Sequence, residues 1–253
     1  MKRIKIKRYI GLIASVIATA VMMPALGACS GKKDNAGKAR ADYAQSLQDS
    51  VTALKAEIDS CNSNIAMLRE RQDVWLRDFT TVANEREAAP YMIYTPFRGK
   101  YPPASTSLMA RLAENGQFEL VAACSGKRFN SITVTAPSVS ATSEIVPADQ
   151  ALNYMAGNLN VVMFTGTAAD SIGHLIADNQ LNAITVTFVN NGPVASWKMP
   201  LDYSKMIMAT YELYASQRDM NAMERRIPML SRKIDLLRRH LDRSGNNQDK
   251  EQK

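Results

Sequence analysis

The sequence predicts an α+β protein: a long antiparallel coiled-coil hairpin with a small, mostly antiparallel β-containing head inserted between its two helices. Two observations lead to this prediction. Apolar residues recur at alternating steps of three and four before Pro90 and again after Pro200, and between these prolines the pattern changes to that of strands. The predicted segments are a signal segment (1–28), a tether (29–40), a first stalk helix (41–89), the head (90–200), a second stalk helix (201–244) and a disordered polar tail (245–253).

The amino terminus has the pattern of a secretory signal. The stretch MKRIKIKR is followed by a continuous apolar run that ends at Leu26-Gly27-Ala28-Cys29. This last motif resembles the lipobox of bacterial lipoproteins. The resemblance implies that the signal is cut before Cys29 and that this cysteine is acylated, so that the protein is attached to a membrane through its lipid.

Two alternatives remain for this segment. The run Tyr9–Ala28 is about long enough to span a bilayer as an uncleaved helix, and the protein could also be secreted without a lipid. By analogy with enterobacterial sorting, Ser30 in place of an aspartate favours the outer membrane. We therefore expect a lipid-anchored protein of the cell envelope.

Charge gives no reason to expect a nucleic-acid partner. The whole chain carries +7, and five of its cations lie in the first eight residues, so removal of the signal segment leaves about +2. Apart from Cys29 the chain has two cysteines, Cys61 and Cys124, which fall in different predicted regions. We predict no disulfide between them.

The first long helix is predicted by an apolar series that extends over more than five heptads. Proline and glycine are absent from it until Pro90, and its one clearly polar member is Gln72. The series consists of Ala44, Leu47, Val51, Leu54, Ile58, Cys61, Ile65, Leu68, Gln72, Trp75, Phe79 and Val82.

A second series of the same kind follows Pro200, and Ser244-Gly245 ends it. Pro228 lies within it, and we expect a kink there. The series consists of Met206, Ala209, Leu213, Ser216, Met220, Met223, Ile227, Leu230, Ile234, Leu237 and Leu241.

The two series match end to end in one antiparallel register. It places Leu47 opposite Leu241, Ile58 opposite Leu230, and Leu68 opposite Met220. In the same register, the polar members Gln72 and Ser216 face each other, Phe79 faces the small Ala209, and Val82 faces Met206. A single buried polar layer is a known device for fixing register. The alternatives are that each helix pairs with a second chain, giving a homo-oligomer, or that both helices pack as ordinary core of the head.

For the head, we expect about four to six strands and a few small helices. Strands are predicted over 117–124, 129–136 and 160–166, and a hairpin over 183–199 with Asn191-Gly192 at its turn. Helices are predicted over 107–115, from Pro147 to about Met155, and over 169–179, and a loop over 136–149.

The head offers few candidates for chemistry. His174 lies at steps of four from Asp170 and Asp178 on a predicted helix. This arrangement could orient an imidazole, but a solvated helix face is the better interpretation. His240 lies in a last helical turn, where a cation suits the helix dipole. We find no nucleophile motif, phosphate loop or metal-ligand spacing, and we predict no cofactor, no metal and no catalysis.

One segment of the head has the composition of a binding surface. Residues 91–103, YMIYTPFRGKYPP, combine aromatics, cations and prolines, which are typical of interface hot spots. We prefer the interpretation that the aromatics instead wedge the joint between stalk and head, because the segment follows the first helix. The candidate binding residues are Tyr91, Tyr94, Phe97, Arg98 and Tyr101.

The order of segments resembles that of uncharacterised stalk-and-head lipoproteins of Bacteroidota-type bacteria. This resemblance implies a cellular location and an architecture, and it implies no activity. We expect a lipid-anchored envelope protein whose head binds a protein or glycan partner or acts as a scaffold. The alternatives are a structural component of an envelope assembly that self-associates through the stalk, and an unrecognised envelope hydrolase.

Overall fold

The structure is a computed structural model that describes residues 33–83, 89–148 and 151–246. It divides into two compact units, residues 1–45 and 46–253. The first unit contributes only the start of helix α1 (Lys33–Trp75) to the described part. The predicted signal segment, Cys29 and the tail from residue 247 lie outside the described residues.

Helix α1 differs from the predicted first helix at both ends. It begins at Lys33, within the predicted tether, and it ends at Trp75. A 3-10 turn, η1 (Leu76–Asp78), and strand β1 (Phe79–Val82) follow. Phe79 and Val82 continue the apolar spacing of the helix, but the β-branched run Thr80-Thr81-Val82 favours a strand, and β1 pairs with β2 (Tyr91–Tyr94). The prediction that Phe79 faces Ala209 in a helical seam is therefore wrong, as is the pairing of Val82 with Met206.

Two antiparallel sheets form the centre of the second unit. The six-stranded sheet contains, in spatial order, β1, β2, β3 (Ser107–Ala113), β4 (Phe118–Ser125), β8 (Leu159–Phe164) and β7 (Asn153–Ala156). The four-stranded sheet contains β10 (Pro193–Lys198), β9 (Thr185–Val189), β5 (Ser131–Ala136) and β6 (Val139–Thr142). Each adjacent pair of strands is antiparallel.

Several predicted elements of the head are confirmed. Strands β4, β5 and β8, the β9–β10 hairpin and helix α2 (Gly166–Asp178) lie where the sequence placed them. The hairpin turn has Asn191 at φ 55° and Gly192 at φ 138°, which explains why this pair suits it. The predicted loop over 136–149 contains one further strand, β6.

Two short helices and the number of strands were predicted wrongly. Residues 107–113 form strand β3, in which six of the seven residues are buried, so burial on both faces removes the alternation that marks a strand. Residues 153–156 form strand β7 where a helix was expected. The sheets also hold more strands than the predicted four to six.

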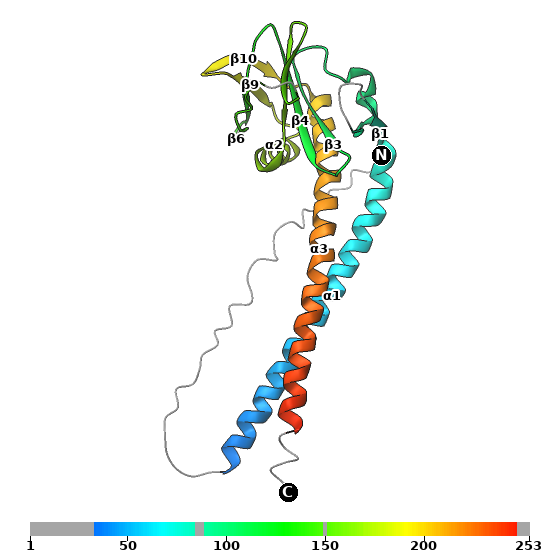
Figure 1. Ribbon diagram of the computed structural model, residues 1–253, viewed down its shortest axis with the longest axis vertical. Coiled ribbons are helices and arrows are strands. Elements are labelled where there is room, and N and C mark those ends of the chain that lie inside the picture. Colours follow the sequence, from blue (N-terminus) through cyan, green and yellow to red (C-terminus); the bar gives the residue numbers. More distant parts are fainter. Residues whose placement is uncertain (1–32, 84–88, 149–150, 247–253) are drawn as a thin grey trace. The chain divides into compact units, whose positions relative to one another are not determined.

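Helix α3 (Leu201–Asn246) is continuous through Pro228. Its first part lies beside α2 and β3 (Figure 1) and contributes Met206, Ile207 and Leu213 to the core shared by the sheets and α2. We use "head" for the two sheets, α2, η2 (Thr95–Lys100) and residues 201–217 of α3. The predicted boundary at residue 200 therefore lies too early, because the first turns of α3 belong to the core of the head.

Beyond the head, α3 is buried along one stripe only. From Arg218 to Arg243 the residues that are not exposed are Met220, Met223, Ile227, Leu230, Ile234, Leu237 and Leu241. These are the members of the predicted series, and Val51, Leu54 and Ile58 of α1 pack with Leu230, Ile234 and Leu237 in one apolar cluster. We call this contact the seam.

Two ion pairs flank the seam. Arg69 Nη2 lies 2.6 Å from Glu224 Oε1, and Arg226 pairs with Glu57. Ser216, which the sequence placed opposite Gln72, is buried and donates its hydroxyl hydrogen bond to the carbonyl of Leu213 in its own helix. The pairing of Ser216 with Gln72 stays a prediction.

The contact between α2 and the core depends on a glycine. A Cβ atom at Gly173 would lie 2.6 Å from Tyr211 Cδ2 and 2.7 Å from Phe118 Cε1. Both rings are buried, and they stack edge to face with centroids 5.5 Å apart. A side chain at residue 173 would therefore separate α2 from β4 and α3.

We predict that Gly173→Ala destabilises the fold by about 1–3 kcal/mol, because overpacking of a closed core costs that much and exceeds the gain in helix propensity. Urea unfolding followed by circular dichroism measures the change. Gly99→Ala is the matched control, since no atom lies within 4 Å of the Cβ position there. Equal stability of the two variants would contradict the close approach of α2 to these rings.

Candidate functional site

The aromatic segment predicted as a binding surface lies mostly inside the head. Tyr91 and Phe97 are only 3% and 5% exposed, so they are not available to a partner, and this part of the prediction is wrong. Phe97 packs edge to face on Tyr203 of α3 with ring centroids 5.0 Å apart. Tyr94 is half-buried against Phe79, with ring centroids 5.7 Å apart. Both contacts lie within the head, so the preferred interpretation, that the aromatics wedge the joint between stalk and head, stays a prediction.

Another residue of the segment, Lys100, is fixed to the first turn of α3. Lys100 Nζ lies 2.7 Å from Asp202 Oδ2 and stands over the rings of Phe97 and Tyr203. The hydrogen bond from Lys100 lowers the pKa of the Asp202 carboxyl. Arg98 is exposed, and it is the candidate binding residue of this segment that remains fully on the surface.

A buried ion pair on the six-stranded sheet was not predicted. Arg111 of β3 and Glu119 of β4 are cross-strand neighbours with Nε and Oε2 2.6 Å apart. The guanidinium stands 4.2 Å from the centre of the Tyr91 ring and donates to the Tyr101 hydroxyl at 3.3 Å. These contacts give a buried charge its partners, which is a structural role. The helix predicted over 107–115 concealed this strand pairing.

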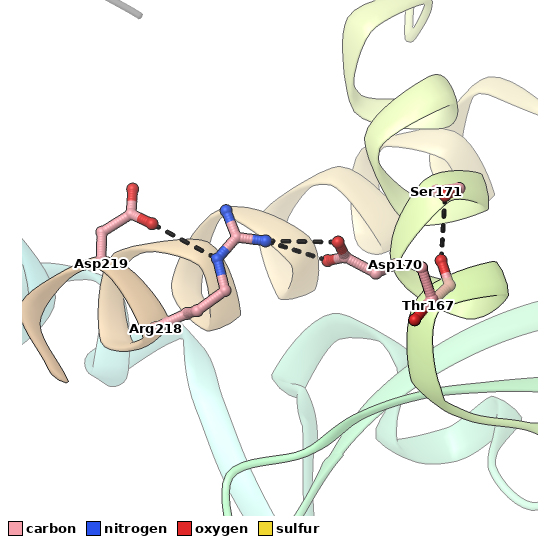
Figure 2. Close-up of polar contacts among 5 residues, drawn as sticks. All are labelled: Thr167, Asp170, Ser171, Arg218 and Asp219. Atoms are coloured by element: carbon pink, nitrogen blue, oxygen red, sulfur yellow. Dashed lines mark hydrogen bonds and ion pairs between the residues drawn. The ribbon is translucent and has the colours of Figure 1, made fainter. Parts of the chain in front are cut away.

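The two carboxylates of α2 have different partners, and Asp178 is the one that lies beside His174. Asp170 faces Arg218 of α3, whose Nη1 lies 3.2 Å and 3.3 Å from the two carboxylate oxygens, while Arg218 Nε lies 3.3 Å from Asp219 Oδ1 (Figure 2). His174 is 60% exposed, with Nδ1 3.4 Å from Asp178 Oδ2. The solvated face expected here therefore holds for His174, whereas Asp170 joins α2 to α3.

Tyr211 lies behind this ion pair. Its ring packs on Phe118 and lies 5.9 Å from the His174 ring. Burial, followed by the nearby Asp170 carboxylate, raises the pKa of the Tyr211 phenol to about 12. The phenol is therefore a neutral packing group at ordinary pH.

Next to Arg218, the surface is hollowed. We call this feature the polar hollow. It has a volume of about 170 Å³, opens to solvent, and lies between the β3–β4 turn and α3. Its lining consists of Asn115, Gly116, Tyr214, Gln217, Arg218, Asn221 and Arg225.

The polar hollow carries hydrogen-bond donors and acceptors and one aromatic ring, which are the groups that bind a polar ligand. Sequence reasoning missed all of its side chains. Those on α3 lie on the face that a coiled coil turns to solvent, and Asn115-Gly116 was expected only to end a helix. The one available signal was the mixture of amides and arginines over 217–225.

Other expectations on chemistry concern cysteines and metals. Cys61 and Cys124 are both buried and free, so the prediction of no disulfide between them is confirmed. Burial raises the pKa of the Cys124 thiol. Among the described residues, no three His, Cys, Asp or Glu side chains lie close enough to hold a metal ion.

Within residues 33–83, 89–148 and 151–246, none of the helices combines the length and the apolar composition that crossing a bilayer requires. Comparisons with models of protein families, with curated proteins and with solved structures find no match for this chain. The polar hollow therefore has to be interpreted from its own chemistry.

We predict that Tyr211→Phe makes stability less sensitive to alkaline pH. The folded protein keeps the phenolic proton up to about pH 12, whereas an unfolded tyrosine loses it near pH 10, so this group's stabilisation is complete below pH 10 and is lost as pH rises toward 12. Urea midpoints at pH 8, 9, 10 and 11 should fall more steeply for the unaltered protein than for the variant. Parallel curves would contradict the raised pKa.

Proposed function

We propose that this chain is a lipid-anchored protein of the bacterial cell envelope, with its lipid on Cys29. In this proposal α1 and α3 form an antiparallel coiled-coil hairpin, the stalk, and the head inserted between them binds an envelope partner without catalysis. The lipid attachment rests on the motif Leu26-Gly27-Ala28-Cys29 and on the segment before it.

The two ion pairs of the seam are the observation that carries the hairpin. Arg69 follows Leu68, and Glu224 lies one turn beyond Met220, the predicted partner of Leu68. Glu57 precedes Ile58, and Arg226 lies one turn before Leu230, the predicted partner of Ile58. Such flanking pairs are expected at the positions beside the apolar layers of an antiparallel coiled coil, in the register that the sequence favours.

A stalk that presents a head needs a stiff connection to it, and two features of the structure support such a connection. Helix α3 passes without a break from the core of the head into the seam. At the end of α1, Trp75 packs against the core of the head. Because both helices are fixed to the head, the seam and the head should move as one body.

A second candidate function, assembly through the stalk, is favoured by a separate observation. Four large apolar side chains, each seven residues from another on its helix, are exposed: Met67, Val74, Met229 and Leu236, at 44%, 57%, 61% and 56%. Exposed apolar rows of this kind occur where helices associate with further helices. Sedimentation of the purified protein separates the two functions, since a stable dimer or trimer at low micromolar concentration favours assembly.

We predict that Ile227→Cys forms a disulfide with the native Cys61 within one chain. The register that pairs Ile58 with Leu230 also pairs Cys61 with Ile227, and Cys61 is buried while Ile227 is half-buried. After mild oxidation, mass spectrometry of a tryptic digest should show the two peptides joined in monomeric protein.

Ile234→Cys is the matched control for this cross-link. Residue 234 lies on the same stripe but two turns farther along α3, so it should not reach Cys61. A cross-link found only between two chains, or equally with Ile234→Cys, would show that the proposed hairpin register is wrong.

We predict that Cys29→Ala abolishes incorporation of labelled fatty acid and releases the protein from the membrane fraction, because the attachment depends on acylation of that sulfur and of the new amino terminus. Cys61→Ala, which changes a buried thiol of the seam, should leave both properties unchanged. Membrane retention of unlabelled Cys29→Ala would instead favour an uncleaved apolar helix.

A further inference from the structure

We propose that the polar hollow binds one sugar unit of a glycan. The inference deepens the proposed function, on which it rests for the presence of an envelope partner, and it names the chemical class of that partner. The argument uses the turn Asn115-Gly116, the face of α3 that it approaches, and the balance of charge around them.

The β3–β4 turn supplies one wall of the hollow. Asn115 Oδ1 accepts a hydrogen bond from the backbone N–H of Gln117 at 2.9 Å, which commits the oxygen and leaves the amide hydrogens as donors. Gly116 has φ 79°, and a Cβ there would lie 3.6 Å from Gln217 Oε1. The turn therefore holds the Asn115 amide beside α3 in a fixed conformation.

Helix α3 supplies the opposite wall. Tyr214, Arg218, Asn221 and Arg225 follow one another at steps of four, three and four, which places them on one face of the helix. The Tyr214 ring is half-buried and is supported by Phe118, with centroids 5.6 Å apart. Arg218 is held by Asp170, with its Cζ 5.6 Å from the centre of the Tyr214 ring. The side chains of Tyr214 and Arg218 on this wall are therefore held in place by the protein itself.

These groups match the chemistry of a sugar ring. Neighbouring sugar hydroxyls each donate and accept hydrogen bonds, as do the amides of Gln217 and Asn221, while Asn115 and Arg225 add donors. A hollow of about 170 Å³ that opens to solvent suits one unit of a longer chain.

The charges around the hollow favour this ligand over a phosphate or a nucleic acid. Arg218 is balanced by Asp170 and Asp219, so its charge is largely neutralised. Glu114, next to Asn115, is exposed and adds a negative charge on the side of the turn. Of the two arginines in the lining, Arg225 has no acidic partner among the other lining residues. Its charge would favour a sugar that carries a carboxylate over a neutral sugar.

The test measures binding of defined tetrasaccharides to the full lipidated chain, purified in a detergent without a sugar headgroup. The probes are chitotetraose and mannotetraose as neutral glycans and tetragalacturonate as an acidic one, and titration calorimetry gives each Kd. We expect at least one of them to bind. Asn221→Ala should then raise the Kd about fivefold to tenfold, because the loss of one hydrogen bond costs about 1 kcal/mol of binding free energy.

Two arginine variants complete the design. Arg225→Gln should weaken tetragalacturonate about tenfold and a neutral probe less, because a charge-assisted hydrogen bond is the stronger one. Arg232→Gln is the matched control: Arg232 is exposed on α3 seven residues beyond Arg225, outside the hollow, and its loss should change no Kd. Circular dichroism checks that each variant is folded.

Failure to bind all three probes would overturn the inference, as would binding that is insensitive to Asn221→Ala and Arg225→Gln or equally sensitive to Arg232→Gln. Neither result would bear on the lipid anchor or on the register of the seam, which Cys29→Ala and Ile227→Cys test separately. If those two experiments fail and the glycan still binds, the sugar site is supported and the proposed lipid anchor and hairpin register are contradicted.

Discussion

The structure depends on helix α3, which is part of the core of the head and also forms one side of the seam. Over residues 201–217, α3 is buried on most sides among the sheets and α2, and from Arg218 onward it is buried along a single stripe. Backbone hydrogen bonds run through both parts, since the helix is unbroken, so the orientation of the seam follows from the packing of the head. Met206 shows how closely the first part is fitted, because its sulfur accepts a hydrogen bond from the Ala110 backbone N–H at 3.3 Å.

Magnitudes distinguish what stabilises the seam from what reports its register. A fully buried leucine, isoleucine or valine contributes about 1.5–3 kcal/mol, and the cluster formed by Val51, Leu54, Leu230 and Ile234 contains four of them. The pair Arg69–Glu224 is 64% and 45% exposed, and ion pairs of that kind contribute about 0–1 kcal/mol. Apolar burial therefore holds the two helices together, while the ion pairs mark which residues lie opposite each other.

Polar side chains from three parts of the chain meet where α3 leaves the head. Before this point most of the circumference of the helix is buried, and beyond it only one stripe is buried. The face that carries Arg218, Asn221 and Arg225 is therefore exposed to solvent. The β3–β4 turn and Asp170 of α2 reach the same point from elsewhere in the chain. A surface assembled in this way has fixed geometry without being part of the core, and this combination suits recognition of a small polar ligand.

The sequence by itself determined the two apolar stripes, the α+β character, the strands β4, β5 and β8 and the β9–β10 hairpin, because each depends on periodicity or turn chemistry within a short segment. Only the tertiary structure decided that Phe79 enters a strand, that residues 107–113 are a doubly buried strand, and that Tyr91 and Phe97 are core. In each case pairing with a distant segment outweighs local preference. The polar hollow is a further example, since Asn115 and Asn221 line the same surface only when β3, β4 and α3 pack together, and the spacing of residues along the chain does not predict this.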